Sequence, residues 1–134
     1  MVVGVTNHGA KVEQIVVPDC NGKLGDVVLG YSILAGVLEG SPSMGAFIGR
    51  CAGQIANARF SLNGFEHLPS VNEGRYRLHG GVKGSRFQVF DVVRHSSSSV
   101  EVRYLFADGE EGFPSALALR LTYSVQEMNE LVLD

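Results

Sequence analysis

The sequence contains little cysteine, with only Cys20 and Cys51 among its 134 residues. Two cysteines are too few for a disulfide framework, and their separation fits no zinc-binding pattern. We therefore interpret both as buried or half-buried free thiols. The sequence predicts no disulfide and no metal site built on sulfur.

Basic patches and long apolar runs are also missing. The formal net charge is −3, and no basic stripe is visible, so nucleic acid is not expected as a partner. No apolar stretch approaches the roughly 20 residues that a membrane helix needs, and the N-terminus lacks the order of a signal peptide. We expect a cytoplasmic protein with no membrane partner.

Helical periodicity is almost absent, and apolar residues recur with a period of two. Between residues 100 and 106 the valines and aromatic residues face one way, whereas Glu101, Arg103 and Leu105 face the other. Residues 117–125 repeat this alternation. The sequence also predicts a strand over residues 12–17, ended by Pro18, and shorter strands over residues 26–29 and 88–93.

Turn signals separate these segments. The dipeptides at residues 21–22 and 63–64 are both Asn-Gly, which tolerates positive φ at both central positions of a hairpin. The second one predicts a hairpin that pairs Leu62 with Phe65 and Phe60 with His67. Further turns are expected at residues 96–99 and from residue 108 to residue 114.

Short strands with glycine-rich turns indicate an all-β fold, an antiparallel sandwich or barrel. We find no internal repeat and no linker, so residues 1–134 are expected to form a single domain. Both ends have strand-like sequence, which predicts that the chain is a fragment of a sandwich, incomplete by itself. Uncovered strand edges then favour self-association.

His79 is the best single candidate for chemistry, because it lies between Leu78 and two glycines that permit close approach of a ligand. On these facts alone, a functional and a structural role are equally supported. A structural or surface role is favoured for the other three histidines, and a solvated loop for the adjacent Glu110 and Glu111. No histidine has metal-ligand spacing, and the residues after the glycines read as strand, which argues against a phosphate loop. The other histidines are His8, His67 and His95.

Several longer motifs carry a family resemblance. They are NHGA at residues 7–10, PDCNGKLGDVVLGY at 18–31, GAFIGRCAGQIANARFSLNG at 45–64, LHGG at 78–81 and DGEEGFP at 108–114. In this order and spacing the chain resembles the N-terminal portion of the aldose 1-epimerases, or mutarotases. The resemblance covers nearly the whole sequence.

The resemblance implies an antiparallel β-sandwich of the galactose mutarotase-like type. It also implies an isomerase that interconverts the α and β anomers of aldohexoses such as galactose and glucose. In that chemistry a base removes the anomeric hydroxyl proton and an acid protonates the ring oxygen, with no cofactor and no metal. By resemblance, His79 is the histidine that hydrogen-bonds the sugar near its ring oxygen, and it is our catalytic and substrate-binding candidate.

Two departures from the family pattern bear on activity. An Asn-Arg pair that contacts sugar hydroxyls in the family is replaced by Gly53 and Gln54, so the arginine fork is lost. Gln54 still offers a hydrogen-bond donor and acceptor, and we retain both residues as substrate-binding candidates. The resemblance places the base glutamate and the acid histidine outside these 134 residues, so the chain is expected to be inactive or nearly so.

Three other functions stay open from the sequence. A non-catalytic relative that binds sugar or a protein partner is the main alternative, with Gly53 and Gln54 as signs of decay. An epimerase acting on a phosphorylated hexose would want additional arginines, and the loss at position 54 argues mildly against it. The chain could also be an unrelated β-sandwich interaction module, but this hypothesis requires that the ordered motifs match the family by chance.

Overall fold

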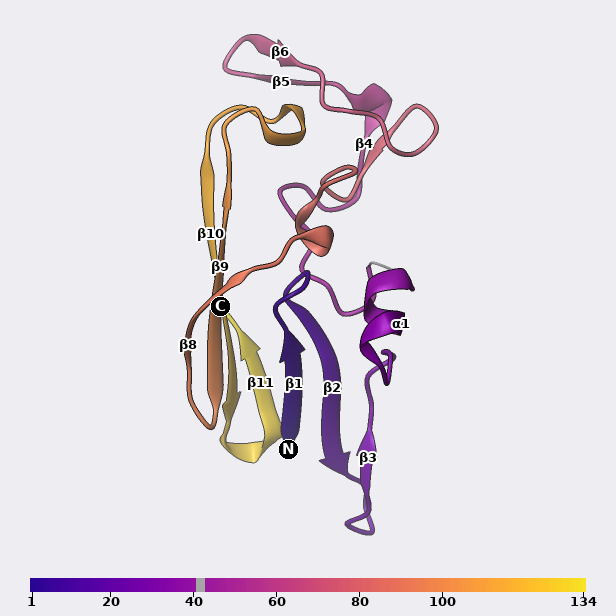
Figure 1. Ribbon diagram of the computed structural model, residues 1–134, viewed down its shortest axis with the longest axis vertical. Helices are drawn as coiled ribbons and strands as arrows, with labels where there is room; N and C mark the ends of the chain where they lie inside the picture. Colours follow the sequence, from indigo (N-terminus) through magenta and orange to yellow (C-terminus); the bar gives the residue numbers. More distant parts are fainter. Residues whose placement is uncertain (41–42) are drawn as a thin grey trace.

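The computed structural model describes residues 1–40 and 43–134, which fold mainly into antiparallel strands (Figure 1). One sheet has three strands in the order β1-β2-β3, and a second has four in the order β11-β10-β9-β8. The three strands are β1 (Val2–Thr6), β2 (Lys11–Pro18) and β3 (Leu24–Asp26). The four strands are β8 (Asp91–His95), β9 (Ser99–Phe106), β10 (Leu117–Gln126) and β11 (Glu130–Leu133).

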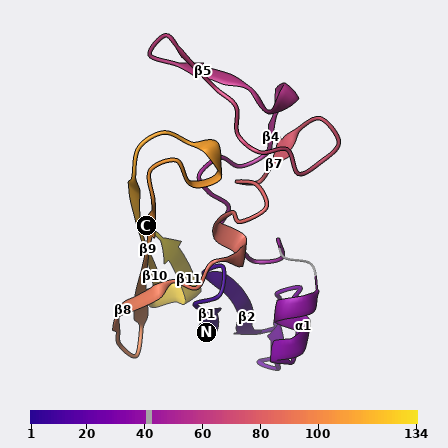
Figure 2. The same cartoon turned by 45° about the horizontal axis from the view of Figure 1, so that its top comes forward.

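Two small strand pairs lie beyond one end of these sheets (Figures 1 and 2). β4 (Gln54–Ile55) pairs with β7 (Arg77–Leu78), and β5 (Phe60–Leu62) pairs with β6 (Phe65–His67). The connection between β9 and β10 reaches toward them from the four-stranded sheet. This end of the molecule therefore gathers the LHGG motif, the DGEEGFP motif and the later part of the motif at residues 45–64.

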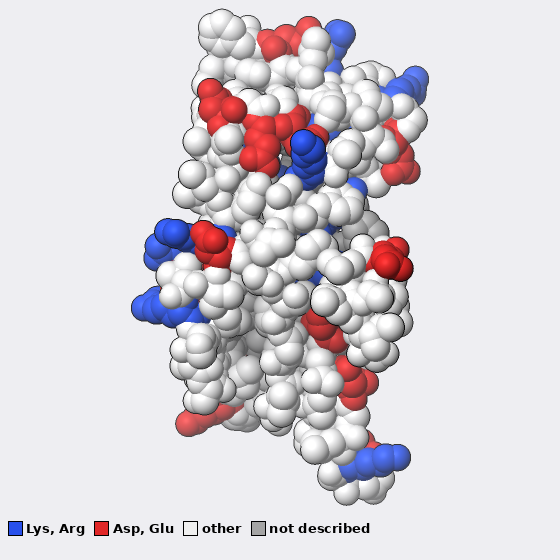
Figure 3. All heavy atoms as spheres, viewed as in Figure 1, with Lys and Arg blue, Asp and Glu red and all other residues white. Residues whose placement is uncertain are grey.

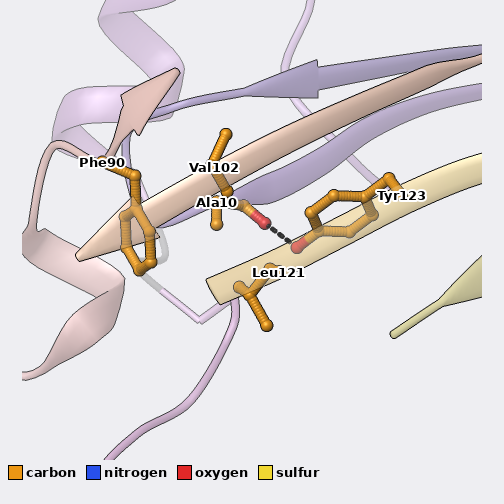
Figure 4. Packing of buried hydrophobic residues seen from close by; sticks show 5 residues of the cluster. All are labelled: Ala10, Phe90, Val102, Leu121 and Tyr123. Carbon is orange, nitrogen blue, oxygen red and sulfur yellow. Dashed lines mark hydrogen bonds between the residues drawn. The ribbon is translucent and has the colours of Figure 1, made fainter. Parts of the chain in front are cut away.

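The hydrophobic core lies where the two main sheets meet. Its fully buried members come from the β1–β2 turn, the segment before β8, and strands β9 and β10 (Figure 4). Tyr123 is 4% exposed, and its hydroxyl donates a hydrogen bond of 2.5 Å to the carbonyl of Ala10. This bond ties β10 of one sheet to the turn of the other. The cluster is Ala10, Phe90, Val102, Leu121 and Tyr123.

The antiparallel sandwich, the strands over 100–106 and 117–125, and the Asn-Gly hairpin are confirmed. The hairpin has the predicted register, Leu62 with Phe65 and Phe60 with His67, and both turn residues have positive φ. Two short strands were placed incorrectly, because β3 covers residues 24–26 rather than 26–29 and β8 begins at residue 91 rather than 88. The Asp26 carboxylate accepts hydrogen bonds from the backbone N–H groups of Ile15 and Val28, which ends the ladder there.

One short helix escaped the sequence analysis. Helix α1 (Leu34–Glu39) has six residues, too few to display a helical period, and it buries only Val37. Lys11, itself 1% exposed, donates from Nζ to the carbonyl of Val37 at 3.1 Å. Single 3₁₀ turns occupy Ala56–Ala58, Ser85–Phe87, Glu110–Gly112 and Glu127–Asn129.

Glu101 is buried, although the alternation along β9 places it on the opposite face from Val102. Its side chain is 4% exposed, because Arg94 on β8 and Arg120 on β10 cover it from both sides. Arg94 Nε donates to Oε2 at 2.9 Å, and Arg120 Nε lies 3.1 Å from Oε1. The outer face of this sheet therefore carries a carboxylate enclosed by two exposed arginines.

Both cysteines are free thiols, as predicted, but Cys20 is exposed and only Cys51 is partly covered. Figure 3 shows charged side chains of both signs in small groups on one face, with uncharged surface between them. Within residues 1–40 and 43–134, no helix is long and apolar enough to cross a membrane. The same residues bring no three His, Cys, Asp or Glu side chains together as a metal ligand set.

Candidate functional site

His79 is held against Gly53 by the pairing of β4 with β7. The backbone N–H of His79 donates to the Gly53 carbonyl at 3.0 Å, and the Gly53 N–H donates to His79 Nδ1 at 3.1 Å. An imidazole nitrogen that accepts a hydrogen bond carries no proton, so the neutral ring holds its proton on Nε2. The chain thus presents a half-buried imidazole with Nε2–H as its free donor.

The backbone at His79 turns sharply in the left-handed region. Residues 79, 80 and 81 have φ values of 52°, 76° and 94° in succession. A Cβ at Gly80 would collide with the carbonyl of Gly49, and one at Gly84 would lie 2.6 Å from the carbonyl of His79. Gly80 and Gly84 are therefore required for the turn that presents the imidazole.

Gly53 and Gln54 replace the Asn-Arg pair of the family pattern, and the backbone conformation at residue 53 suits either Gly or Asn. Gly53 has a φ of 75°, with open space where a Cβ would lie, and Gln54 is exposed on β4. Asparagine is among the few non-glycine residues that adopt positive φ readily, so Asn and Gly suit the same conformation here. The Asn and Arg side chains of the family pattern are therefore absent here, while the Gly53 N–H bonds to His79 Nδ1.

Arg77 lies directly behind the His79 turn and is 1% exposed. Its guanidinium donates to the Gly80 carbonyl at 2.5 Å and to the Ser70 backbone carbonyl and Oγ at 3.2 and 3.0 Å. It stacks on the Phe113 ring at 4.6 Å and lies 3.3 Å from Glu111 Oε2. Sequence reasoning missed Arg77, because its partners are spread over more than 40 residues.

Glu111 is not in a solvated loop, so that prediction is wrong. Its side chain is 10% exposed, accepts from Ser70 Oγ at 2.7 Å and the Lys83 N–H at 2.6 Å, and pairs with Arg77. Burial alone raises the pKa of Glu111, but these hydrogen bonds and the guanidinium charge outweigh it and lower the pKa below its usual value. The carboxylate is held ionised by structural partners.

The Glu110 carboxylate is also held by structural hydrogen bonds. Its Oε2 accepts from the Ala107 N–H at 2.8 Å, and its Oε1 lies 3.2 Å from the Tyr104 hydroxyl, which donates to it. Both glutamates of the DGEEGFP motif therefore fasten the loop in which they lie. The sequence favoured a solvated loop for both, but each has its own structural partners.

Arg50, in the motif at residues 45–64, has a structural position. Its guanidinium donates to the carbonyls of Ala107, Pro114 and Ser115 at 3.1, 2.9 and 2.7 Å. Its cationic group also lies over Phe113, 5.7 Å from the ring centre. Arg50 and Arg77 thus clamp the β9–β10 connection onto the β4–β7 pair.

The other three histidines lie away from this site, as favoured from the sequence. His67 stacks on Phe60 with ring centres 5.1 Å apart, and His95 is exposed on β8. His8 is half-buried and bridges to Val89; burial, and then the charge of Lys11, lower its pKa. The site therefore centres on one histidine.

Comparisons with known proteins identify the family and the fold of this chain. Residues 1–134 match the family model described as aldose 1-epimerase. Galactose mutarotase from Bos taurus is 38% identical over 98% of this chain, and the protein of that name from Homo sapiens is 37% identical over 92%. The chain spans 38% and 36% of the lengths of these relatives.

A solved structure has the same fold as well as related sequence. A GalM/aldose epimerase homologue from C. elegans superposes with a TM-score of 0.93 at 30% identity, covering 98% of this chain and 40% of that one. The galactose 1-epimerase of Lactobacillus acidophilus has a TM-score of 0.82 at 23% identity, which shows the shared fold. On the match of its whole length, its sequence relatives and its fold, this chain belongs to the aldose 1-epimerase family.

Proposed function

We propose that this chain supplies the His79 side of a sugar site in an enzyme that interconverts the α and β anomers of aldohexoses such as galactose and glucose. One observation carries the proposal: the Gly53 N–H occupies His79 Nδ1 and leaves Nε2–H as the remaining donor of the ring. Family membership supplies the reaction class.

The chemistry needs such a donor at the ring oxygen. A base removes the proton of the anomeric hydroxyl, the bond between C1 and the ring oxygen breaks, and the ring oxygen takes up a proton. The C1 carbonyl then rotates, and the ring recloses on its other face. A hydrogen bond from His79 Nε2–H to the ring oxygen would stabilise the charge that develops there as the bond breaks.

We further propose that these 134 residues do not accelerate the reaction by themselves. Glu110 and Glu111 are bound to structural partners, and the resemblance places the base and acid elsewhere. Each general acid or base typically contributes about 10²–10⁴-fold to the rate. Sugar binding without turnover is the activity that this part of the site supports.

Polarimetry and saturation-transfer NMR test both halves of the proposal. We expect freshly dissolved α-glucose or α-galactose to mutarotate at the buffer rate in the presence of the chain. Saturation transfer to the hexose ring protons should be seen with the unaltered protein, lost in His79→Ala and retained in the matched control His95→Ala. A rate clearly above buffer that His79→Ala abolishes would overturn the claim of inactivity, and equal transfer in both variants would overturn the role of His79.

A second function, non-catalytic sugar binding in the natural protein, is favoured by Gly53 and Gln54. Without the arginine fork, the site loses charge-assisted hydrogen bonds to sugar hydroxyls. Polarimetry on the complete product of the gene separates the two functions, because only the enzyme shortens the half-time of mutarotation.

We also propose that the chain self-associates. Many large apolar side chains are exposed, among them Leu29 at 81% and Phe65 at 72%, and β3, β8 and β11 each form a sheet edge. Sedimentation velocity over a concentration series should show mass increasing with concentration. A single monomeric species throughout would contradict this.

A further inference from the structure

The His79 turn is conformationally demanding, and its own backbone holds it weakly. Three successive residues have positive φ, and His79 is the non-glycine member, for which this region costs energy. The Gly81 N–H reaches the Leu78 carbonyl at 3.0 Å, as in an isolated tight turn. Additional contacts from outside the turn must therefore keep the imidazole in place.

Arg77 provides the contact from behind. Its guanidinium donates at 2.5 Å to the carbonyl of Gly80, the residue immediately after His79, and the side chain is 1% exposed. A bond from a buried charged donor is stronger than a neutral one and is not replaced by water. Arg77 thereby fixes the peptide group adjacent to the histidine.

Glu111 provides the contact on the far side of the turn. Its Oε1 accepts the Lys83 N–H at 2.6 Å, and its Oε2 pairs with Arg77 at 3.3 Å. The carboxylate comes from the β9–β10 connection, which Arg50 also clamps. One ion pair therefore spans the turn from Gly80 to Lys83 and joins it to a distant loop.

We propose that Arg77, together with Glu111, is a positioning residue that holds the His79 imidazole in its sugar-facing orientation with Nδ1 on the Gly53 N–H. Arg77 itself is too deeply buried to touch a sugar, and it acts through the Gly80 peptide. The meaning of this orientation rests on the proposed function, but the orientation itself is measurable without sugar.

The test compares Arg77→Met and Glu111→Gln with the unaltered chain. Methionine keeps a long unbranched side chain without charge or donors. Glutamine keeps an acceptor for the Lys83 N–H but breaks the ion pair. Arg94→Met is the matched control, because Arg94 also pairs with a buried glutamate but lies on β8 in the four-stranded sheet.

Two readouts separate positioning from general stability. The ¹⁵N shifts of the imidazole report the tautomer, and the exchange rate of the Gly53 amide reports its bond to Nδ1. We expect a dominant Nε2–H tautomer in the unaltered chain and in Arg94→Met. In Arg77→Met we expect a mixture of tautomers and Gly53 exchange about tenfold faster, while the β9 and β10 amides stay protected.

Glu111→Gln should change both readouts in the same direction and by less. An unchanged tautomer and Gly53 exchange rate in a folded Arg77→Met overturns the proposal. If Arg77→Met does not fold, Glu111→Gln decides by the same readouts, and failure of both to fold shows a stability element and likewise overturns it. Saturation transfer to hexose, measured separately, reports on the proposed function alone, so its absence leaves the positioning result intact.

Discussion

Replacing Tyr123 with phenylalanine should lower the stability of the sandwich at neutral pH. The Tyr123 hydroxyl donates to the buried Ala10 carbonyl at 2.5 Å and links the two sheets. Phenylalanine preserves the ring packing, so the loss is confined to one buried hydrogen bond, about 1–3 kcal/mol when a polar partner is left behind. Urea unfolding at pH 7 measures this, with Tyr76→Phe as control, because that hydroxyl only meets the exposed Arg75 side chain.

At alkaline pH, the titration of Tyr123 should lower the free energy of unfolding as the pH rises. Burial raises the pKa of Tyr123 from 10.0 to about 12, so the folded protein keeps the phenol proton where the unfolded chain releases it. The unfolded state then binds fewer protons, and the free energy of unfolding falls as the pH rises through this window. At about 1.36 kcal/mol per pKa unit, the contribution lost between pH 10 and pH 12 is about 2.7 kcal/mol.

The difference between the two proteins isolates this effect. The stability advantage of the unaltered chain over Tyr123→Phe should be constant up to about pH 9.5 and then shrink by about 1.4 kcal/mol per pH unit. Tyr104, whose pKa is raised by burial and then by the Glu110 charge, titrates in both proteins and cancels. Parallel stability curves from pH 7 to pH 11.5 would refute the reasoning.

Two further changes test other parts of the structure. Arg94→Ala or Arg120→Ala alone should lower the free energy of unfolding by about 1 kcal/mol or less, because the remaining arginine still pairs with Glu101. The double variant should lower it by about 3–5 kcal/mol, because the buried carboxylate is then left without a partner. Additive losses in a double-mutant cycle of urea unfolding would contradict this. Gly53→Asn with Gln54→Arg should raise hexose affinity about tenfold in an NMR titration by restoring charge-assisted donors, and the version with Gln54→Lys should gain less.

The sequence predicted the features that depend on local chemistry. Asn63 and Gly64 accept positive φ at both turn positions, which sets the hairpin register by itself. The alternation over residues 117–125 predicted a strand, because a period of two over nine residues is a signal that can be read from the local sequence. The six residues of α1 show no such period, and no local pattern encodes the hydrogen bond from Lys11 to the Val37 carbonyl.

The burial of charged residues could not be predicted, because it depends on partners that are distant in sequence. Alternation placed Glu101 on the face of β9 that also carries Arg103 and Leu105, but it could not show that arginines on the two neighbouring strands enclose the Glu101 carboxylate. Glu111 was assigned to solvent because its neighbours are Glu110 and glycine, whereas its partners are Arg77 and Ser70, far away in sequence. Burial of a charge depends on which strands become neighbours, and that information is absent from a local window.

His79 shows where the two kinds of information meet. Its glycine neighbours identified a site where a ligand could approach, and the family resemblance gave it a sugar-binding role. Neither could say which ring nitrogen faces the ligand, because this follows from the pairing of β4 with β7 that brings the Gly53 N–H to Nδ1. The replacement of the Asn-Arg pair by Gly53 and Gln54 therefore leaves the Nε2–H tautomer of His79 in place, since the group that orients the ring is a backbone amide.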